Sequence, residues 1–415
     1  MQWVTLTPIR SHLNLKLGVN EQSKGYDAFL ASMASVDARL NVQKFRDKKA
    51  YRLIDDDDRN TLLLFRLSHT YPEQSATVEA QVYGNTLTVV SVTFDWPDVD
   101  YDEALEARLQ SQTTALIDRF YQEQLYPLLL QLPNHVKPAY LQPVGAFSGF
   151  HDLNSSTGEQ GVEQLWTACL LRLPRSQVTK QQATLKHWLK DTRRPEDAED
   201  IVRGECSYSM SWLHYVVVDE PGQSSDFRLD AMCLAQYIYS VQDVCNAHLN
   251  GALSQAFLED NPSDAEHTLE TVRAATRLHS CAYQDALKYL RRDKKQLVEE
   301  ILAVWDFDRL TKNSQELIDI CSSRISDIHT ERSEKSTFYT DLILVAIGFI
   351  SLFDLAISLS EYSRSYMASA TLGYRDDVPS GFLSMVAAWQ TDNLLAMSGV
   401  SIVVLLLGYW YVKRR

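Results

Sequence analysis

The stretch LILVAIGFISLFDLAISL, residues 342–359, is apolar except for two serines and one carboxylate, Asp354. As a helix, its eighteen residues are about 27 Å long, close to the hydrocarbon thickness of a bilayer. A second run, LLAMSGVSIVVLLLGYWYV at 394–412, has no charge and precedes the basic residues 413–415. Aromatic residues followed by a basic tail are typical of a membrane helix that stops at a cytoplasmic surface. The sequence therefore predicts a membrane protein with transmembrane helices at 336–361 and 393–412.

The polar side chains of the first predicted span lie mainly on one helical face. At 100° per residue, Ser351, Asp354, Ser358 and Glu361 fall within an arc of about 80°. A carboxylate near the centre of a span costs roughly 2.5 to 3.5 kcal/mol, so it usually faces a bundle interior or water. Asp354 is thus expected either to face a pore or to make a hydrogen bond between helices. Steps of three and four extend the predicted pore-lining face to Thr340, Leu344, Ile347, Ser351, Asp354, Ser358 and Glu361.

A pore of this kind requires several copies of the chain, because two helices cannot enclose a conduit. Around a shared axis, Leu344 and Ile347 would form an aliphatic constriction that closes by dewetting. Asp354 and Glu361 would form rings that attract cations, and they are the predicted metal-ion ligands. The expected partners are therefore other copies of the chain, cations and the lipid bilayer.

The composition indicates which partners suit the chain. Its 415 residues include 54 acidic and 40 basic side chains, and 45% of all residues are hydrophobic. A nucleic-acid surface needs clustered Lys and Arg to replace phosphate counterions, so no direct nucleic-acid partner is expected. A local basic patch at Arg291, Arg292, Lys294 and Lys295 is a candidate site for a nucleotide or an anionic headgroup.

No residue pattern indicates catalysis. The chain has no GxxxxGK[ST], GxGxxG, HExxH or GxSxG motif, and we expect it not to be an enzyme. The six cysteines form no CxxC pair, as is typical of isolated core thiols in a reducing compartment. The first residues lack the long apolar region of a secretory signal, and the residues between the two spans are not enriched in Lys or Arg. We therefore expect a multi-pass protein of the inner membrane with both termini cytoplasmic.

The residues before the spans predict an α+β domain. Alternating runs at 77–94 surround Gly84 and Asn85, a pair typical of a two-residue hairpin turn. Further strands are predicted at 51–54, 61–67, 165–173 and 206–220, with Asp55 to Asp58 as a solvated turn or, alternatively, a divalent-ion site. Helical spacing over 101–132 predicts a helix packed on the sheet.

Long helices are predicted for the remainder of the cytosolic part. Residues 230–258 have helical spacing, and 263–347 contain neither Pro nor Gly. We expect two long helices as a hairpin, the second beginning near Ser314 and continuing into the membrane. Leu317, Ile320, Cys321 and Ile328 are its expected apolar stripe. The predicted organisation is a cytosolic α+β domain at 1–228, a helical stalk at 229–335, a pore-lining helix at 336–361, an external loop at 362–392, a second transmembrane helix at 393–412 and a basic tail at 413–415.

This layout resembles the CorA superfamily of divalent cation channels. The shared features are a cytosolic α+β domain, a long helix continuous with the first span, a short external loop, a second span and a basic C-terminus. The resemblance implies a pentamer whose first spans line the pore and whose long helices respond to a ligand of the cytosolic domain. Residues 361–364, EYSR, stand where the family carries Gly-Met-Asn, so magnesium selectivity is not implied. The layout is also similar to CorA-like membrane effectors of prokaryotic antiviral defence, in which a nucleotide messenger activates the protein.

The leading hypothesis is an oligomeric cation channel gated by a ligand or ion, such as a divalent cation or a nucleotide, bound to its cytosolic domain. The alternative is a membrane-anchored sensor or effector, for example a nucleotide-activated defence effector that permeabilises the membrane without selective transport. The two differ in whether the spans conduct ions selectively or only assemble the cytosolic domains.

Overall fold

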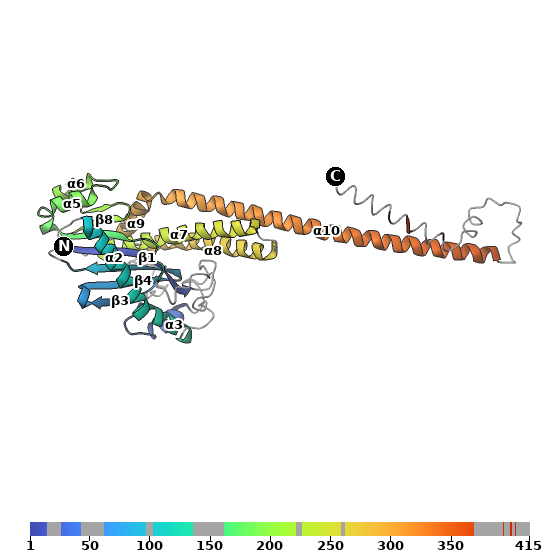
Figure 1. The fold of residues 1–415 in the computed structure, drawn as a ribbon, viewed down its shortest axis with the longest axis horizontal. Helices are drawn as coiled ribbons and strands as arrows, with labels where there is room; N and C mark the ends of the chain where they lie inside the picture. The colour runs from blue at the N-terminus through green and yellow to red at the C-terminus, as the bar shows by residue number, and fades with distance from the viewer. Residues whose placement is uncertain are drawn as a thin grey trace. The chain divides into compact units, whose positions relative to one another are not determined.

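The computed structural model describes residues 1–14, 26–42, 62–96, 103–135, 162–220, 226–258 and 262–368, and single positions at 393, 399, 400 and 403. The chain divides into two compact units, Met1–Ile325 and Ser326–Arg415. The first unit is an α+β domain with a mixed sheet, followed by helices (Figure 1). The predicted second span, the external loop beyond 368, the basic tail and the aspartates at 55–58 lie outside the described residues, apart from those single positions.

Among the described residues, the sheet of the first unit has eight strands in the order β2-β3-β4-β5-β1-β6-β8-β7. Neighbouring strands are antiparallel except β6 and β8, which are parallel. The strands are β1 (Gln2–Asn14), β2 (Asn41–Val42), β3 (Leu63–Tyr71), β4 (Ala76–Tyr83), β5 (Asn85–Phe94), β6 (Ala168–Pro174), β7 (Tyr208–Met210) and β8 (His214–Asp219).

Both faces of the sheet are buried, as the alternation of β1 shows. Trp3 belongs to the core shared with α1 (Tyr26–Ala34), α2 (Glu103–Phe120), α3 (Tyr126–His135), α5 (Gln182–Leu189) and α6 (Asp197–Arg203). Val4 and Leu6 belong to the core shared with α7 (Asp226–Leu258), α8 (Pro262–Tyr289) and α9 (Arg292–Val304). Successive strand residues face opposite sides, so one strand contributes to both cores. The predicted packing of residues 101–132 on the sheet is confirmed for residues 103–132, which the structure describes.

The β4–β5 hairpin is confirmed, but its predicted turn is wrong. A two-residue turn at Gly84 and Asn85 would pair Tyr83 with residue 86, whereas the observed register pairs Val82 with Thr88. Asn85 already belongs to β5, where it pairs with Asn14 of β1. Pairing with a third strand therefore overrides the local turn preference of the Gly-Asn pair.

The long helices differ in number and start from the prediction. Three helices, α8, α9 and α10 (Phe307–Ala368), replace the expected hairpin of two, and Figure 1 shows α7 and α8 side by side. The second predicted helix does not begin near Ser314, because α9 ends at Val304 and the chain turns at Asp306, whose φ is +56°. The expected stripe is wrong at Ile320, which is 49% exposed, whereas Ile318 and Ile325 are buried together with Leu317 and Cys321.

Candidate functional site

One helix in the described part of the chain is long and apolar enough to cross a membrane. It is α10, in which an 18-residue window has a mean hydropathy of 2.5 and is not buried. Leu344, Ile347 and Leu355 expose more than half of their surface. Apolar surface on this scale is unfavourable in water, so it requires a membrane or another apolar partner. The helix continues to Ala368, seven residues beyond the predicted end of the first span.

The structure places all seven predicted pore-lining residues on α10. They are Thr340, Leu344, Ile347, Ser351, Asp354, Ser358 and Glu361, and all are exposed. The Thr340 hydroxyl donates to the Ser336 carbonyl at 3.0 Å, which satisfies its donor within the helix. Asp354 and Glu361 are two turns apart, about 10 Å along the axis. A single chain therefore cannot bring both carboxylates to one ion, and each ring would have to come from several copies.

The start of α10 is held by an aromatic cluster. Trp305, just before the turn, lies 5.4 Å from both Trp212 and Tyr239 between ring centroids. Its indole Nε1 donates to the Ser211 carbonyl at 3.5 Å, and Phe307 lies 6.3 Å from Tyr239. Ser211 and Trp212 lie between β7 and β8, so these contacts tie the beginning of α10 to the sheet and to α7.

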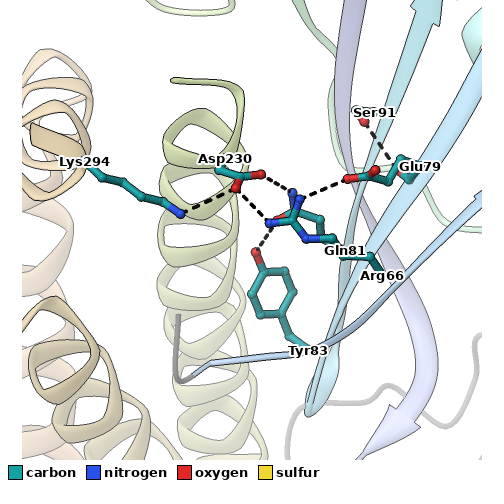
Figure 2. A network of polar contacts seen from close by, with 7 residues as sticks. All are labelled: Arg66, Glu79, Gln81, Tyr83, Ser91, Asp230 and Lys294. Carbon is teal, nitrogen blue, oxygen red and sulfur yellow. Dashed lines mark hydrogen bonds and ion pairs between the residues drawn. The ribbon is translucent and has the colours of Figure 1, made fainter. Parts of the chain in front are cut away.

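A polar network joins the sheet to α7 and α9, as Figure 2 shows. Asp230 of α7 accepts from Arg66 of β3 at 2.8 Å and from Gln81 of β4 at 3.1 Å. The Lys294 ammonium of α9 lies 3.7 Å from the same carboxylate and is only 2% exposed. Arg66 also lies 3.4 Å from Glu79. Two cations and two carboxylates therefore form ion pairs where β3 and β4 pack against α7 and α9. These pairs stabilise the position of the helices on the sheet.

The charge on Arg66 is strongly favoured in this network. Burial alone would lower the pKa of Arg66, but the hydrogen bond from Arg66 to Asp230 and the attraction of the nearby carboxylates raise it above its ordinary value. The phenol of Tyr83 donates to Gln81 at 3.2 Å, and burial raises its pKa. This network was not predicted from the sequence, because Arg66 and Asp230 are 164 residues apart and polar residues recur along β3 and β4.

Three residues of the predicted basic patch have acidic neighbours in the structure. Lys294 is buried beside Asp230, and Lys295 pairs with Glu299 at 3.7 Å. The guanidinium of Arg291 lies 3.3 Å from Asp293 and 5.4 Å from the centroid of the Phe227 ring. Burial removes Lys294 from a surface site, and a nucleotide site on the other cations of the patch stays a prediction.

A polar cavity of about 550 Å³ lies beside the short strand β7. Two of its carboxylates accept hydrogen bonds from protein hydroxyls, since Ser209 donates to Asp197 at 2.6 Å and Tyr208 donates to Glu300 at 3.0 Å. More carboxylates than guanidinium groups line it, which favours a cationic ligand over a nucleotide because acidic groups repel phosphates. The lining residues are Arg175, Arg194, Asp197, Asp200, Gly204, Glu205, Cys206, Ser207, Tyr208, Ser209, Met210, Glu220 and Glu300.

Comparisons with family models, with curated proteins and with solved structures give no match for this chain. The class of protein is therefore defined by the fold of the chain and by its apolar helix. It is an α+β domain with a mixed sheet, followed by helices, the last of which is long and apolar enough to span a membrane.

Proposed function

We propose that this chain is a subunit of an oligomeric membrane conduit for cations, controlled by its N-terminal α+β domain. The observation that carries the proposal is the exposed apolar segment of α10, on which Ser351, Asp354 and Ser358 follow one helical face. Lipid favours the apolar faces of such a helix, whereas the carboxylate is favoured only beside water or a polar partner. Several copies that turn this face inward satisfy both requirements.

In this assembly the apolar and the acidic residues of the pore-lining stripe, Thr340 to Glu361, have different functions. Leu344 and Ile347 narrow the conduit and exclude water when they are close together, so ions cannot pass. Asp354 and Glu361 concentrate cations beyond the constriction. The proposed arrangement is a pentamer in the inner membrane, by resemblance to the CorA superfamily, with a second span at 393–412 and both termini cytoplasmic.

Control by the N-terminal domain is supported by how α10 begins. Its first residues pack on Tyr239 and lie next to Trp305, which contacts the loop between β7 and β8. The polar cavity lies beside the same strand β7. A cation bound there would attract Asp197 and Asp200 of α6 and Glu300 of α9, and would thereby change the packing of the elements that precede α10.

The proposal is tested by conductance across planar bilayers containing the reconstituted full-length chain. Asp354→Asn is expected to lower cation conductance at least about fivefold, because each carboxylate that it removes from the ring attracts a cation by about 1 kcal/mol across 4 Å of water. Asp341→Asn, the same change off the stripe, is the matched control. Leu344→Ser should make the closed state leaky, whereas Val345→Ser, which is one residue away and turned by 100°, should not.

Two outcomes would refute the conduit. If Asp354→Asn and Leu344→Ser leave the currents unchanged, the stripe does not line the pathway. If both spans can be exchanged for unrelated apolar helices of equal length without loss of function, the chain is instead a membrane-anchored sensor or effector.

A further inference from the structure

Helices α7 and α10 lie along each other in the same direction within the unit Met1–Ile325. Phe307 packs near Tyr239, the Leu310 carbonyl accepts from Asn246 Nδ2 at 3.1 Å, and Arg324 donates to the Ala256 carbonyl at 3.2 Å. Residue numbers rise together along both helices, so the pair is parallel. We call Gln242 and Asn246 of α7, with Leu310 and Ser314 of α10, the amide seam.

The amide seam contains buried polar atoms that lack hydrogen bonds. Gln242, Asn246 and Ser314 are each at least 96% buried. Within the part of the chain that the structure describes, Gln242 Nε2, Asn246 Oδ1 and Ser314 Oγ have no partner. Most buried polar groups in folded proteins are hydrogen-bonded, and unpaired ones destabilise the conformation that contains them. Three unpaired atoms in one seam therefore indicate a second arrangement in which they are paired.

The spacing of the seam residues defines that arrangement. Gln242 and Asn246 are four residues apart on α7, and Leu310 and Ser314 are four residues apart on α10, so each pair shares a helical face one turn apart. In the observed register, Asn246 bonds the Leu310 carbonyl. If α10 moved by one turn, about 5.4 Å, toward the N-terminus of α7, Leu310 would come level with Gln242 and Ser314 with Asn246.

We propose that the amide seam is a two-register device, in which α10 slides by one helical turn along α7. In the second register, Gln242 Nε2 donates to the Leu310 carbonyl, and the Ser314 hydroxyl donates to Asn246 Oδ1. Each of the three unpaired atoms thus gains a partner. One-turn shifts of packed helices are an established form of switching, because packed side chains favour discrete positions.

Part of the apolar surface of α10 repeats after the same shift. Leu317, Cys321 and Ile325 are buried and four residues apart, so Cys321 would take the place of Leu317, and Ile325 the place of Cys321. The left-handed turn at Asp306 immediately precedes α10 and is the position where the backbone can absorb the displacement. For its effect at the membrane this inference rests on the proposed function, since α10 continues as one helix to Ala368 and would move the pore-lining stripe.

The register can be measured by pulsed electron paramagnetic resonance, without any measurement of conductance. Spin labels are attached at Ala247→Cys on α7 and Ser323→Cys on α10, both exposed positions, in the full chain with Cys206 and Cys281 replaced by serine. Labelled chains in lipid nanodiscs are diluted with unlabelled chains, so that only distances within a chain are observed. The second register shortens the label separation by up to about 5 Å.

Two matched variants distinguish the registers. Asn246→Asp keeps an oxygen that accepts from Ser314 but has no NH2 group to donate to the Leu310 carbonyl, so it is expected to shift the distribution to the shorter distance. Gln242→Leu, one turn away, removes a contact of the second register only and should leave only the longer distance. Ser314→Ala should act like Gln242→Leu, and it serves as the second test if Asn246→Asp does not fold.

The proposal is overturned if the unsubstituted chain and these variants all give one unchanged distance. The seam would then be static, and ordered water would satisfy its polar atoms. Because the measurement reports a distance, a failed register shift and a failed conduit are separate results. The conductance of the Asp354→Asn variant, for example, does not depend on the distance between the two spin labels.

Discussion

Removal of the Asp230 carboxylate should destabilise the N-terminal domain more than removal of its cationic partner Lys294. Asp230→Asn leaves the Lys294 ammonium, which is only 2% exposed, without its counter-charge at 3.7 Å. Breaking a buried ion pair from one side typically costs 3 to 5 kcal/mol. Because one fifth of the Asp230 side chain is exposed to solvent, we expect about 3 kcal/mol, at the lower end of that range.

The matched variant is Lys294→Met, which removes the charge but keeps most of the buried stem. Asp230 then still accepts from Arg66 and Gln81. Replacing a buried charge by an apolar side chain while its counterion stays paired is often near neutral, so we expect a change within about 1 kcal/mol. The double variant should be more stable than Asp230→Asn alone, because it also removes the buried ammonium whose counter-charge Asp230→Asn takes away.

These values are measurable by urea unfolding of the detergent-solubilised full chain, followed by tryptophan fluorescence. A loss of about 3 kcal/mol should also lower the midpoint of thermal unfolding by about 4 °C, because the unfolding entropy of a unit the size of Met1–Ile325 is about 0.7 kcal/mol/K. The reasoning would be refuted if Lys294→Met destabilises the chain as much as Asp230→Asn, with additive effects in the double variant. Such a result would mean that the two charges do not stabilise each other.

Three further predictions concern single positions. Burial lowers the pKa of His279 to about 3, against about 6.5 in the unfolded chain, so the free energy of unfolding should fall as the pH decreases below 6.5. Urea unfolding at each pH should show a loss of about 2 kcal/mol by pH 5, relative to the His279→Leu variant. A thiol reagent at pH 8 should modify exposed Cys281 rapidly, but not Cys245 or Cys321 in the folded chain, because burial raises their pKa values to about 12 and about 11; equal rates would contradict this. Asp306→Val should cost at least about 1 kcal/mol and Asp306→Gly nothing, since φ is +56° there; unfolding midpoints that do not differ would refute the strain.

The sequence predicted the elements whose signal is local. The alternation of β4 and β5 and the helical spacing before Phe120 are properties of short segments, and both elements are observed. The apolar window of α10 was predicted for the same reason, since length and hydropathy need no tertiary information.

The features that were predicted wrongly or not at all depend on contacts between residues far apart in the sequence. The hairpin register depends on the pairing of Asn85 with Asn14 in β1, and the start of α10 depends on the aromatic contacts of Trp305. Ser314 resembles a helix cap in the sequence but is a buried residue within α10. Arg66 and Asp230 are 164 residues apart, so no local pattern could indicate their ion pair.

The proposed conduit is tested most directly by the water accessibility of adjacent positions on α10. Ser351→Cys and Leu352→Cys are compared in proteoliposomes, in a chain with Cys206 and Cys281 replaced by serine, using a charged thiol reagent that does not cross membranes. We predict that the reagent modifies Ser351→Cys and reduces the cation current, whereas Leu352→Cys faces lipid and does not react. Protection of both cysteines, or reaction of Leu352→Cys alone, would contradict a water-filled pathway along this face.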